Sequence, residues 1–167
     1  ESNYFYRTMT INIESNAKIN LGLKILNQRK DGYHNISTLM QEISLYDTIE
    51  LSINETKKIT LLTKGHSTPE DNNNLCYKAA ELFLNTYNID TGVHIHLRKN
   101  IPISAGLGGG SSNAAHVIKG LYNLFNIKLD SEKIFLLCSK IGADVPFFIN
   151  GGLQRATGIG HELESMQ

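Results

Sequence analysis

The feature that most constrains this chain is a glycine-rich stretch that leads directly into a helical pattern. Residues 102–115 read PISAGLGGGSSNAA, and apolar residues at helical spacing follow from Ser111 to Phe125. Glycines permit positive φ and let the backbone approach a ligand closely, while consecutive N–H groups and a helix N-terminus attract anions. Ser111 and Ser112 can cap the helix and offer hydroxyls to a phosphate or to its Mg²⁺. We therefore expect a phosphate-binding loop, with a flexible connector as the alternative.

Composition points to one compact domain. The chain has 167 residues and a mass of 18.6 kDa, and a domain of this length needs neither a disulfide nor a metal for stability. Its 16 basic and 16 acidic residues give a net charge of zero, which argues against a protein that neutralises nucleic-acid phosphates or coats an anionic membrane. No apolar stretch approaches the ~18–20 residues of a membrane span. We expect neither nucleic acid nor a membrane as a partner.

The first residues and the cysteines bear on location. Residues 1–8 carry one Arg and no apolar core, so they are not a signal peptide. We expect them to be a tag or a disordered leader, with Met9 as the natural start. Cys76 and Cys138 are too few and too far apart for a disulfide framework or a zinc site, so we expect two buried thiols. These features favour a reducing, cytosol-like compartment.

The periodicity predicts an α+β domain with strands early and helices late. Residues 17–26 alternate as a strand, with apolar side chains on one face and Lys18 and Asn20 on the other. Residues 27–34 and the glycine-rich residues beyond 142 are expected to be loops. The other predicted elements are a hairpin of strands 48–53 and 58–63, a strand over 93–97, and helices over 74–87, 111–125 and 131–140, the first capped from 72–74 and the last by Asp130 or Ser131.

The glycine-rich loop lacks the marks of three common phosphate motifs. A Walker A loop has a lysine after its glycines, and none follows here. A dinucleotide fingerprint has Gly or Ala where Ser111 stands and an acidic residue about 20 positions later at a strand end, whereas Asp130 fits a helix cap. A protein-kinase loop is followed by a strand rather than a helix.

The loop instead resembles that of the GHMP kinase superfamily, of the form Pro-x-x-x-Gly-Leu-Gly-Ser-Ser-x-Ala. Three further segments resemble family motifs in the same order, so the resemblance runs from about Ile11 to Leu163. They are AKINL (17–21) in the first strand, DGYH (31–34) with LMQ (39–41) in the substrate loop, and GADVPFF (142–148) around the catalytic aspartate. The triple glycine narrows the resemblance to the branch whose substrate carries a cytidine diphosphate group.

This resemblance implies that residues 9–163 form a GHMP kinase N-terminal domain, a mixed sheet with helices packed on one face, similar to a ribosomal protein domain. It implies an ATP-dependent enzyme that uses Mg²⁺ to phosphorylate a small molecule carrying a cytidine diphosphate group. Asp144 would be the general base and Lys18 its electrostatic partner, while Asn20, Tyr33 and His34 would bind the substrate. The residues implied to hold the ATP phosphates are Pro102, Ala105, Gly106, Leu107, Gly108, Gly109, Gly110, Ser111 and Ser112.

Two alternatives remain open. Another member of the superfamily, of the homoserine or mevalonate type, would share the loop, although Tyr33 and His34 speak against it. Family members continue into a second domain that completes the substrate cleft, which we expect to be absent from this chain. The second alternative is therefore a nucleotide-binding domain without turnover. The sequence departs from the family pattern at Ser104, where relatives often have Gly, and at His161, where an acidic residue is common.

Lys99, His94 and His96 lie in or just after the predicted strand over 93–97 and are the remaining candidates for binding. Lys99 precedes the loop and either contacts the nucleotide or is an exposed lysine at a strand end. His94 and His96 share a strand face, but no third ligand at a fixed spacing accompanies them. We therefore expect no protein-bound metal site.

Overall fold

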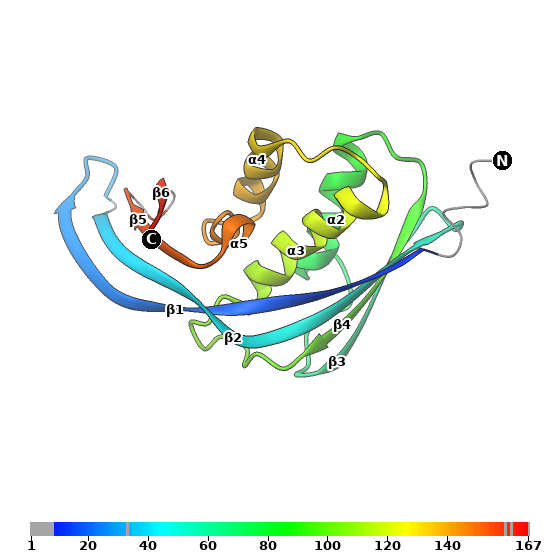
Figure 1. The fold of residues 1–167 in the computed structure, drawn as a ribbon, viewed down its shortest axis with the longest axis horizontal. Coiled ribbons are helices and arrows are strands. Elements are labelled where there is room, and N and C mark those ends of the chain that lie inside the picture. Colours follow the sequence, from blue (N-terminus) through cyan, green and yellow to red (C-terminus); the bar gives the residue numbers. More distant parts are fainter. Residues whose placement is uncertain (1–8, 33, 159, 161, 167) are drawn as a thin grey trace.

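The computed structural model describes residues 9–32, 34–158, 160 and 162–166, and Figure 1 shows a curved sheet with the helices gathered on one side of it. The helices are α2 (Leu75–Thr86), α3 (Gly109–Leu124), α4 (Ser131–Ile141) and the short α5 (Phe147–Asn150). The strands are β1 (Thr10–Gln28), β2 (His34–Asn54), β3 (Ile59–Gly65), β4 (Gly92–Lys99), β5 (Leu153–Thr157) and β6 (Glu162–Ser165).

The sheet is mixed and is organised around the long strand β2. Its order is β3-β4-β2-β5-β6, with β1 paired antiparallel along the other edge of β2. Two strands share the remaining edge of β2, because β4 pairs with residues 48–54 and β5 pairs with residues 38–41. Between them, residues 42–47 have neither strand beside them, and side chains from this gap reach the loops that follow β4 and precede β5.

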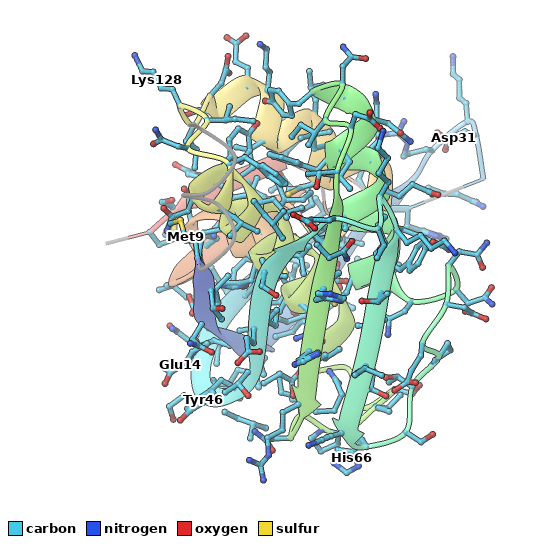
Figure 2. All side chains as sticks on the ribbon, turned by 90° about the vertical axis from the view of Figure 1, so that its right-hand side faces the viewer. Met9, Glu14, Asp31, Tyr46, His66 and Lys128 are labelled. Carbon is cyan, nitrogen blue, oxygen red and sulfur yellow. The ribbon has the colours of Figure 1, made fainter. Side chains whose placement is uncertain are left out.

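The core lies between the sheet and the helices, with α3 at its centre. Helix α3 contacts β1, β2 and all three other helices, and it is buried over most of its length. Gly120 permits this close approach, because a Cβ there would fall 2.6 Å from Leu51 Cδ1. None of the described helices lies on the opposite face of the sheet (Figure 2), which presents polar side chains such as Glu50 and His96. The expected α+β fold, a mixed sheet with helices on one face, is confirmed.

The predicted hairpin of residues 48–53 and 58–63 is wrong. Strand β4 lies between β2 and β3, and β3 runs parallel to β4. The chain does turn where predicted, since Asn54 accepts from the backbone N–H of Thr56 at 3.0 Å and donates to the Lys58 carbonyl at 2.9 Å. The turn leaves room for another strand, and alternation along a strand fixes which face is buried but not which strand lies beside it.

Several strand regions were absent from the prediction, beginning with residues 10–16 of β1. Residues 34–47 belong to β2, where Thr38 is buried and Leu39 is partly exposed, so the apolar pattern does not mark the buried face. Beyond residue 142, β5 and β6 replace the expected loop. The buried face of β5 carries Gln154, whose amide donates to the carbonyls of Phe147 and Gly151 at 2.8 Å.

The helix termini were largely predictable from local caps. Asn74 caps α2 by accepting from Cys76 N at 2.9 Å, and Asp130 caps α4. The serine cap predicted for α3 is wrong, because that helix begins at Gly109 after Gly108 in the left-handed region, with no side-chain cap. Two glycines therefore shape the start of α3, and the serines lie inside its first turn.

Both cysteines are free and buried, as expected, and burial raises the pKa of each thiol to about 12. Within the described residues, none of the helices is long and apolar enough to cross a membrane. Residues 1–8, Tyr33 and His161 lie outside the described part of the chain, so expectations for them stay predictions.

Candidate active site

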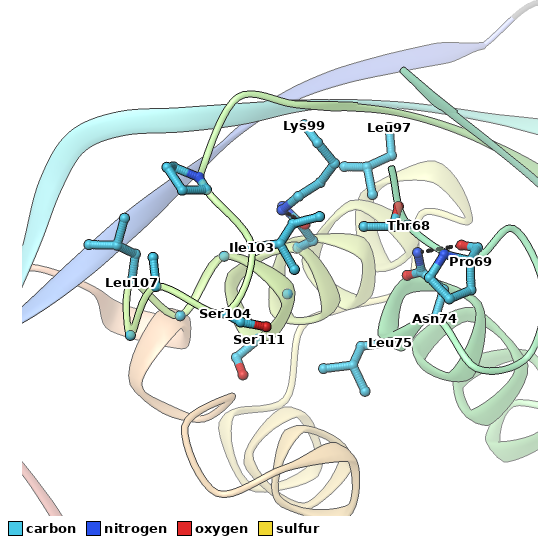
Figure 3. Close-up of a pocket in the computed structure, with 17 residues that line it drawn as sticks. Thr68, Pro69, Asn74, Leu75, Leu97, Lys99, Ile103, Ser104, Leu107 and Ser111 are labelled. Atoms are coloured by element: carbon cyan, nitrogen blue, oxygen red, sulfur yellow. Dashed lines mark hydrogen bonds between the residues drawn. The ribbon is translucent and has the colours of Figure 1, made fainter. Parts of the chain in front are cut away.

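The glycine-rich loop forms one wall of a cavity of about 320 Å³. Residues 102–111 line it together with Lys99 and Asn113, and the opposite wall comes from residues 68–69 and the start of α2 (Figure 3). Leu75 and Leu97 supply apolar surface, while the loop supplies backbone groups. Apolar surface next to an array of backbone amides suits a ligand with an aromatic base and a phosphate chain.

Backbone conformation explains why this loop is rich in glycine. Gly106 and Gly108 have φ of +75° and +68°, which an L side chain rarely adopts. Ser104 also has positive φ, at +57°. The loop is fixed to β1 by the Lys18 backbone N–H, which donates to the Leu107 carbonyl at 2.9 Å. The amides at the start of α3 therefore lie at a defined place beside β1.

The two loop serines have different surroundings. Ser111 lines the cavity. Ser112 is fully buried, and its hydroxyl lies 2.8 Å from Ser15 Oγ. Under Ser112, His116 Nδ1 donates to the Ser112 carbonyl at 2.9 Å. Burial, and then the nearby charge of Lys119, lower the pKa of His116. The Ser112 hydroxyl therefore supports the helix from inside, whereas Ser111 is the serine available to a ligand.

Lys99 is not an exposed lysine at a strand end. Its side chain is 4% exposed, and its ammonium is hydrogen-bonded to Asp47 and to Asn113, the latter at 2.9 Å. Asp47 and Asn113 were missed in the sequence analysis. Asn113 stands inside the loop motif, but Asp47 lies in an unremarkable part of β2, and no local pattern marks it.

Lys18, Asn20 and Asp144 come together beside the loop. Strand β1 turns Lys18 toward the helices, where it is 4% exposed. Its Nζ donates to Asn20 Oδ1 at 3.2 Å and lies 3.9 Å from Asp144 Oδ2. Asp144 is half-exposed and lies in the turn before α5, as its position ahead of Val145-Pro146 predicted. A cation and a carboxylate thus lie side by side next to a phosphate-type loop.

The loop and this pair are in direct contact. A Cβ on Gly108 would lie 3.2 Å from Lys18 Cγ and 2.9 Å from Phe148 Cζ. Phe148 belongs to α5, which begins three residues after Asp144. Gly108 therefore allows β1, the loop and the segment containing Asp144 to meet at one point.

The expected substrate residues are more dispersed. His34 is exposed at the first position of β2, paired with Gln28 at the far end of the β1–β2 arm, away from the helices (Figure 1). Tyr33 lies outside the described residues. Among the described side chains, no group of three or more His, Cys, Asp or Glu could hold a metal ion. His94 is instead bonded to Thr60, and His96 lies 3.2 Å from Glu50.

Known proteins are similar to this chain over most of its length. Residues 74–152 match the sequence model of the N-terminal domain of GHMP kinases. A relative from Prochlorococcus marinus, named 4-diphosphocytidyl-2-C-methyl-D-erythritol kinase, is 48% identical over 156 residues, which cover 93% of this chain. This chain belongs to the GHMP kinase superfamily. It spans about half the length of the curated relatives that it matches, covering 50% of the Prochlorococcus protein and 53% of a Caldicellulosiruptor bescii relative of the same name.

Solved structures show the same relationship among GHMP kinases. A crystal structure of 4-(cytidine 5'-diphospho)-2C-methyl-D-erythritol kinase superposes with a TM-score of 0.81 at 39% identity, covering 93% of this chain and 55% of the other. A mevalonate kinase from Methanococcus jannaschii and a homoserine kinase from Cytophaga hutchinsonii reach TM-scores of 0.72 and 0.73 at 20% and 17% identity. The last two comparisons show the shared fold alone.

Proposed function

We propose that this chain is the nucleotide-binding half of a kinase that transfers phosphate from ATP to the 2-hydroxyl of 4-diphosphocytidyl-2-C-methyl-D-erythritol, in non-mevalonate isoprenoid biosynthesis. The observation that carries the proposal is the meeting of Lys18 and Asp144 beside the glycine-rich loop. Relatives of that name are 44–48% identical to this chain, whereas homoserine and mevalonate kinases are similar in fold only. This difference favours the cytidine-diphosphate substrate over the other two substrate types.

The cavity has the donors that ATP requires. Backbone N–H groups at the start of α3 and the Ser111 hydroxyl face the phosphate end, where the helix dipole favours negative charge. Leu75 and Leu97 offer apolar surface for the base. Mg²⁺ prefers oxygen ligands and commonly binds through substrate phosphates. The Ser111 hydroxyl and the phosphate oxygens would hold Mg²⁺ here, and the ion would neutralise charge on the transferred group.

Lys18 and Asp144 supply the remaining requirements of phosphoryl transfer, namely a proton acceptor and positive charge near the transferred group. Asp144 is half-exposed, so an incoming hydroxyl can reach its carboxylate. The Lys18 ammonium is held by Asn20 and lies next to Asp144. It would stabilise the charge on the γ-phosphate as the oxygen attacks. Asp144 would take the proton from the substrate hydroxyl.

The substrate would extend from this pair toward the arm formed by β1 and β2. Asn20 is exposed next to Lys18, where it would contact the alcohol. Tyr33 and His34 would bind the cytidine, by stacking and by hydrogen bonding to the polar edge of the base.

The test is ATP-dependent phosphorylation of 4-diphosphocytidyl-2-C-methyl-D-erythritol by the wild-type chain and by Asp144→Asn. Loss of a general base costs about 10²–10⁴ in rate, so we expect kcat to fall by that factor. The matched control is Asp90→Asn, which removes an aspartate that is also paired with a lysine, Lys57, but on the surface away from the cavity. Full activity of Asp144→Asn would refute the assignment of the base.

A second candidate is a nucleotide-binding domain without turnover. It is favoured by one observation, that the Asp144 side chain is half-exposed to solvent, since water exclusion from the transferred group commonly needs an enclosed site. Calorimetric ATP binding without product formation in the same assay would support this candidate over the first.

A further inference from the structure

A buried polar network lies directly under the glycine-rich loop. Lys99, Asp47 and Asn113 are 4%, 0% and 1% exposed, and each is hydrogen-bonded to the other two. Asn113 also donates to Ser15 Oγ at 3.0 Å, and that hydroxyl contacts Ser112. A buried ion pair is weak evidence for stability, because desolvation opposes the attraction between the charges. A network of this kind therefore calls for an explanation other than stability.

Asp47 connects both ends of the loop. Its Oδ1 accepts from the backbone N–H groups of Asn100 and Ile101, at 2.7 and 2.8 Å, where the chain leaves β4. Its Oδ2 accepts from the side chain of Asn113 at 2.9 Å, in the first turns of α3 where the chain re-enters regular structure. The glycine-rich residues run between these two attachments. One carboxylate thus sets the distance between the start and the end of the loop.

The Asp47 carboxylate also holds the Lys99 ammonium in place under the loop. A Cβ on Gly109, the first residue of α3, would lie 3.1 Å from Lys99 Nζ. The Lys99 ammonium therefore lies against the helix N-terminus, where it adds to the positive potential of the amides. Asp47 and Asn113 hold it there. Asp47 itself is fully buried, comes from the gap in β2 between β4 and β5, and is not among the residues that line the cavity.

We propose that Asp47 is a positioning residue of the phosphate-binding loop, which acts through Lys99, Asn113 and the amides of residues 100–101 without touching the ligand. This inference rests on the proposed nucleotide site. It assigns to Asp47 the recognition of the phosphate chain and no part in recognition of the base, because its contacts lie at the loop and not at the wall formed by α2.

The decisive variant is Asp47→Asn, which preserves size and one acceptor oxygen. Its NH₂ group would face the donors of Lys99 and Asn113, so the end of the loop at α3 would be released and the ammonium would lose its partner. Two ligands measure binding at the two ends of the cavity separately. Tripolyphosphate tests the loop alone and adenosine tests the base wall alone, each titrated into the wild-type chain and the variant by calorimetry.

We expect Asp47→Asn to weaken tripolyphosphate binding by at least about tenfold, as for loss of a hydrogen bond to a charged group, and adenosine binding by less than about twofold. The control is Ile134→Val, which trims the core under α4. It should lower the thermal midpoint without changing the ratio of the two affinities, so general destabilisation is distinguished from positioning.

Each other outcome is decisive. Equal losses for both probes, or no loss for either, would overturn the positioning role. A wild-type chain that binds neither ATP nor tripolyphosphate would overturn the proposed function and this inference with it. Should Asp47→Asn not fold, Ser15→Ala carries the test, since Ser15 supports Asn113 from outside the cavity. A selective loss of tripolyphosphate affinity in that variant supports the role, and an unchanged ratio overturns it.

Discussion

Gly108 is the point where the loop, Lys18 and Phe148 meet. Replacing it with alanine should reduce the free energy of unfolding for two reasons, which a second glycine variant can separate. The first cost is conformational, since φ is +68° and an L side chain in the left-handed region costs about 1–2 kcal/mol. The second is steric, since the new Cβ would lie 2.9 Å from Phe148 Cζ and 3.2 Å from Lys18 Cγ. Phe148 is 1% exposed and packs against Phe147, so it has little room to move.

Gly106 provides the matched control. Its φ is +75°, but nothing lies within 4 Å of the place where a Cβ would be. Gly106→Ala should therefore lose only the conformational part of the unfolding free energy. Gly108→Ala should lose about 1–3 kcal/mol more, the usual cost of an extra group in a packed site.

Urea unfolding followed by circular dichroism measures both losses under one set of conditions. Gly108→Ala should also reduce kcat in the phosphorylation assay, because the displaced Lys18 side chain lies beside Asp144. Equal losses of unfolding free energy in the two alanine variants would refute the claim that Gly108 is required for close packing.

Two further predictions concern the helices that carry the site. Burial, with the charge of Lys119, lowers the pKa of His116 below its usual 6.5, so the folded chain binds fewer protons than the unfolded chain as the pH falls through that range. The urea concentration at the unfolding midpoint should therefore decrease as the pH is lowered from about 7.5 to 5.5, and it should decrease less in His116→Gln. The same dependence of the midpoint on pH in the variant and the wild-type chain would contradict this. Asn74→Ala removes the cap on Cys76 N and should cost about 1 kcal/mol of the unfolding free energy measured in urea. Asn74→Asp keeps the cap but loses the donor to the Pro69 carbonyl at 2.8 Å, so it should recover only part of that loss.

The parts of the fold that could be predicted from sequence are those set by neighbours in the chain. The helices at α2 and α4 and their caps at Asn74 and Asp130 depend on residues a few positions apart. The glycine-rich loop is equally local, because positive φ and exposed amides are properties of the segment itself. These features were correct to within a few residues.

The rest depends on partners far away in the sequence. Asp47 binds amides 53 and 54 residues later, and nothing in its own surroundings distinguishes it from a surface aspartate. Lys18 is buried next to a register shift between Asn16 and Lys18, and alternation within β1 alone does not predict that burial. The neighbours of the strands were predicted wrongly for the same reason, since alternation does not indicate which strand lies beside which. The site was found through its loop, while the residues that support it were missed.

The division of one edge of β2 between β4 and β5 also has a consequence for the way in which the chain is made. Glu42 accepts from the backbone N–H of Gly152, 110 residues further along, and β5 closes the edge just beyond. At about 5–20 residues per second, the ribosome needs roughly 5–20 s to deliver that partner after Glu42 has emerged. During this interval the hairpin formed by β1 and β2 has an unpaired edge along β2. Unpaired strand edges are where incomplete sheets associate with one another. A nascent chain of this fold should therefore depend on chaperones until β5 has been synthesised.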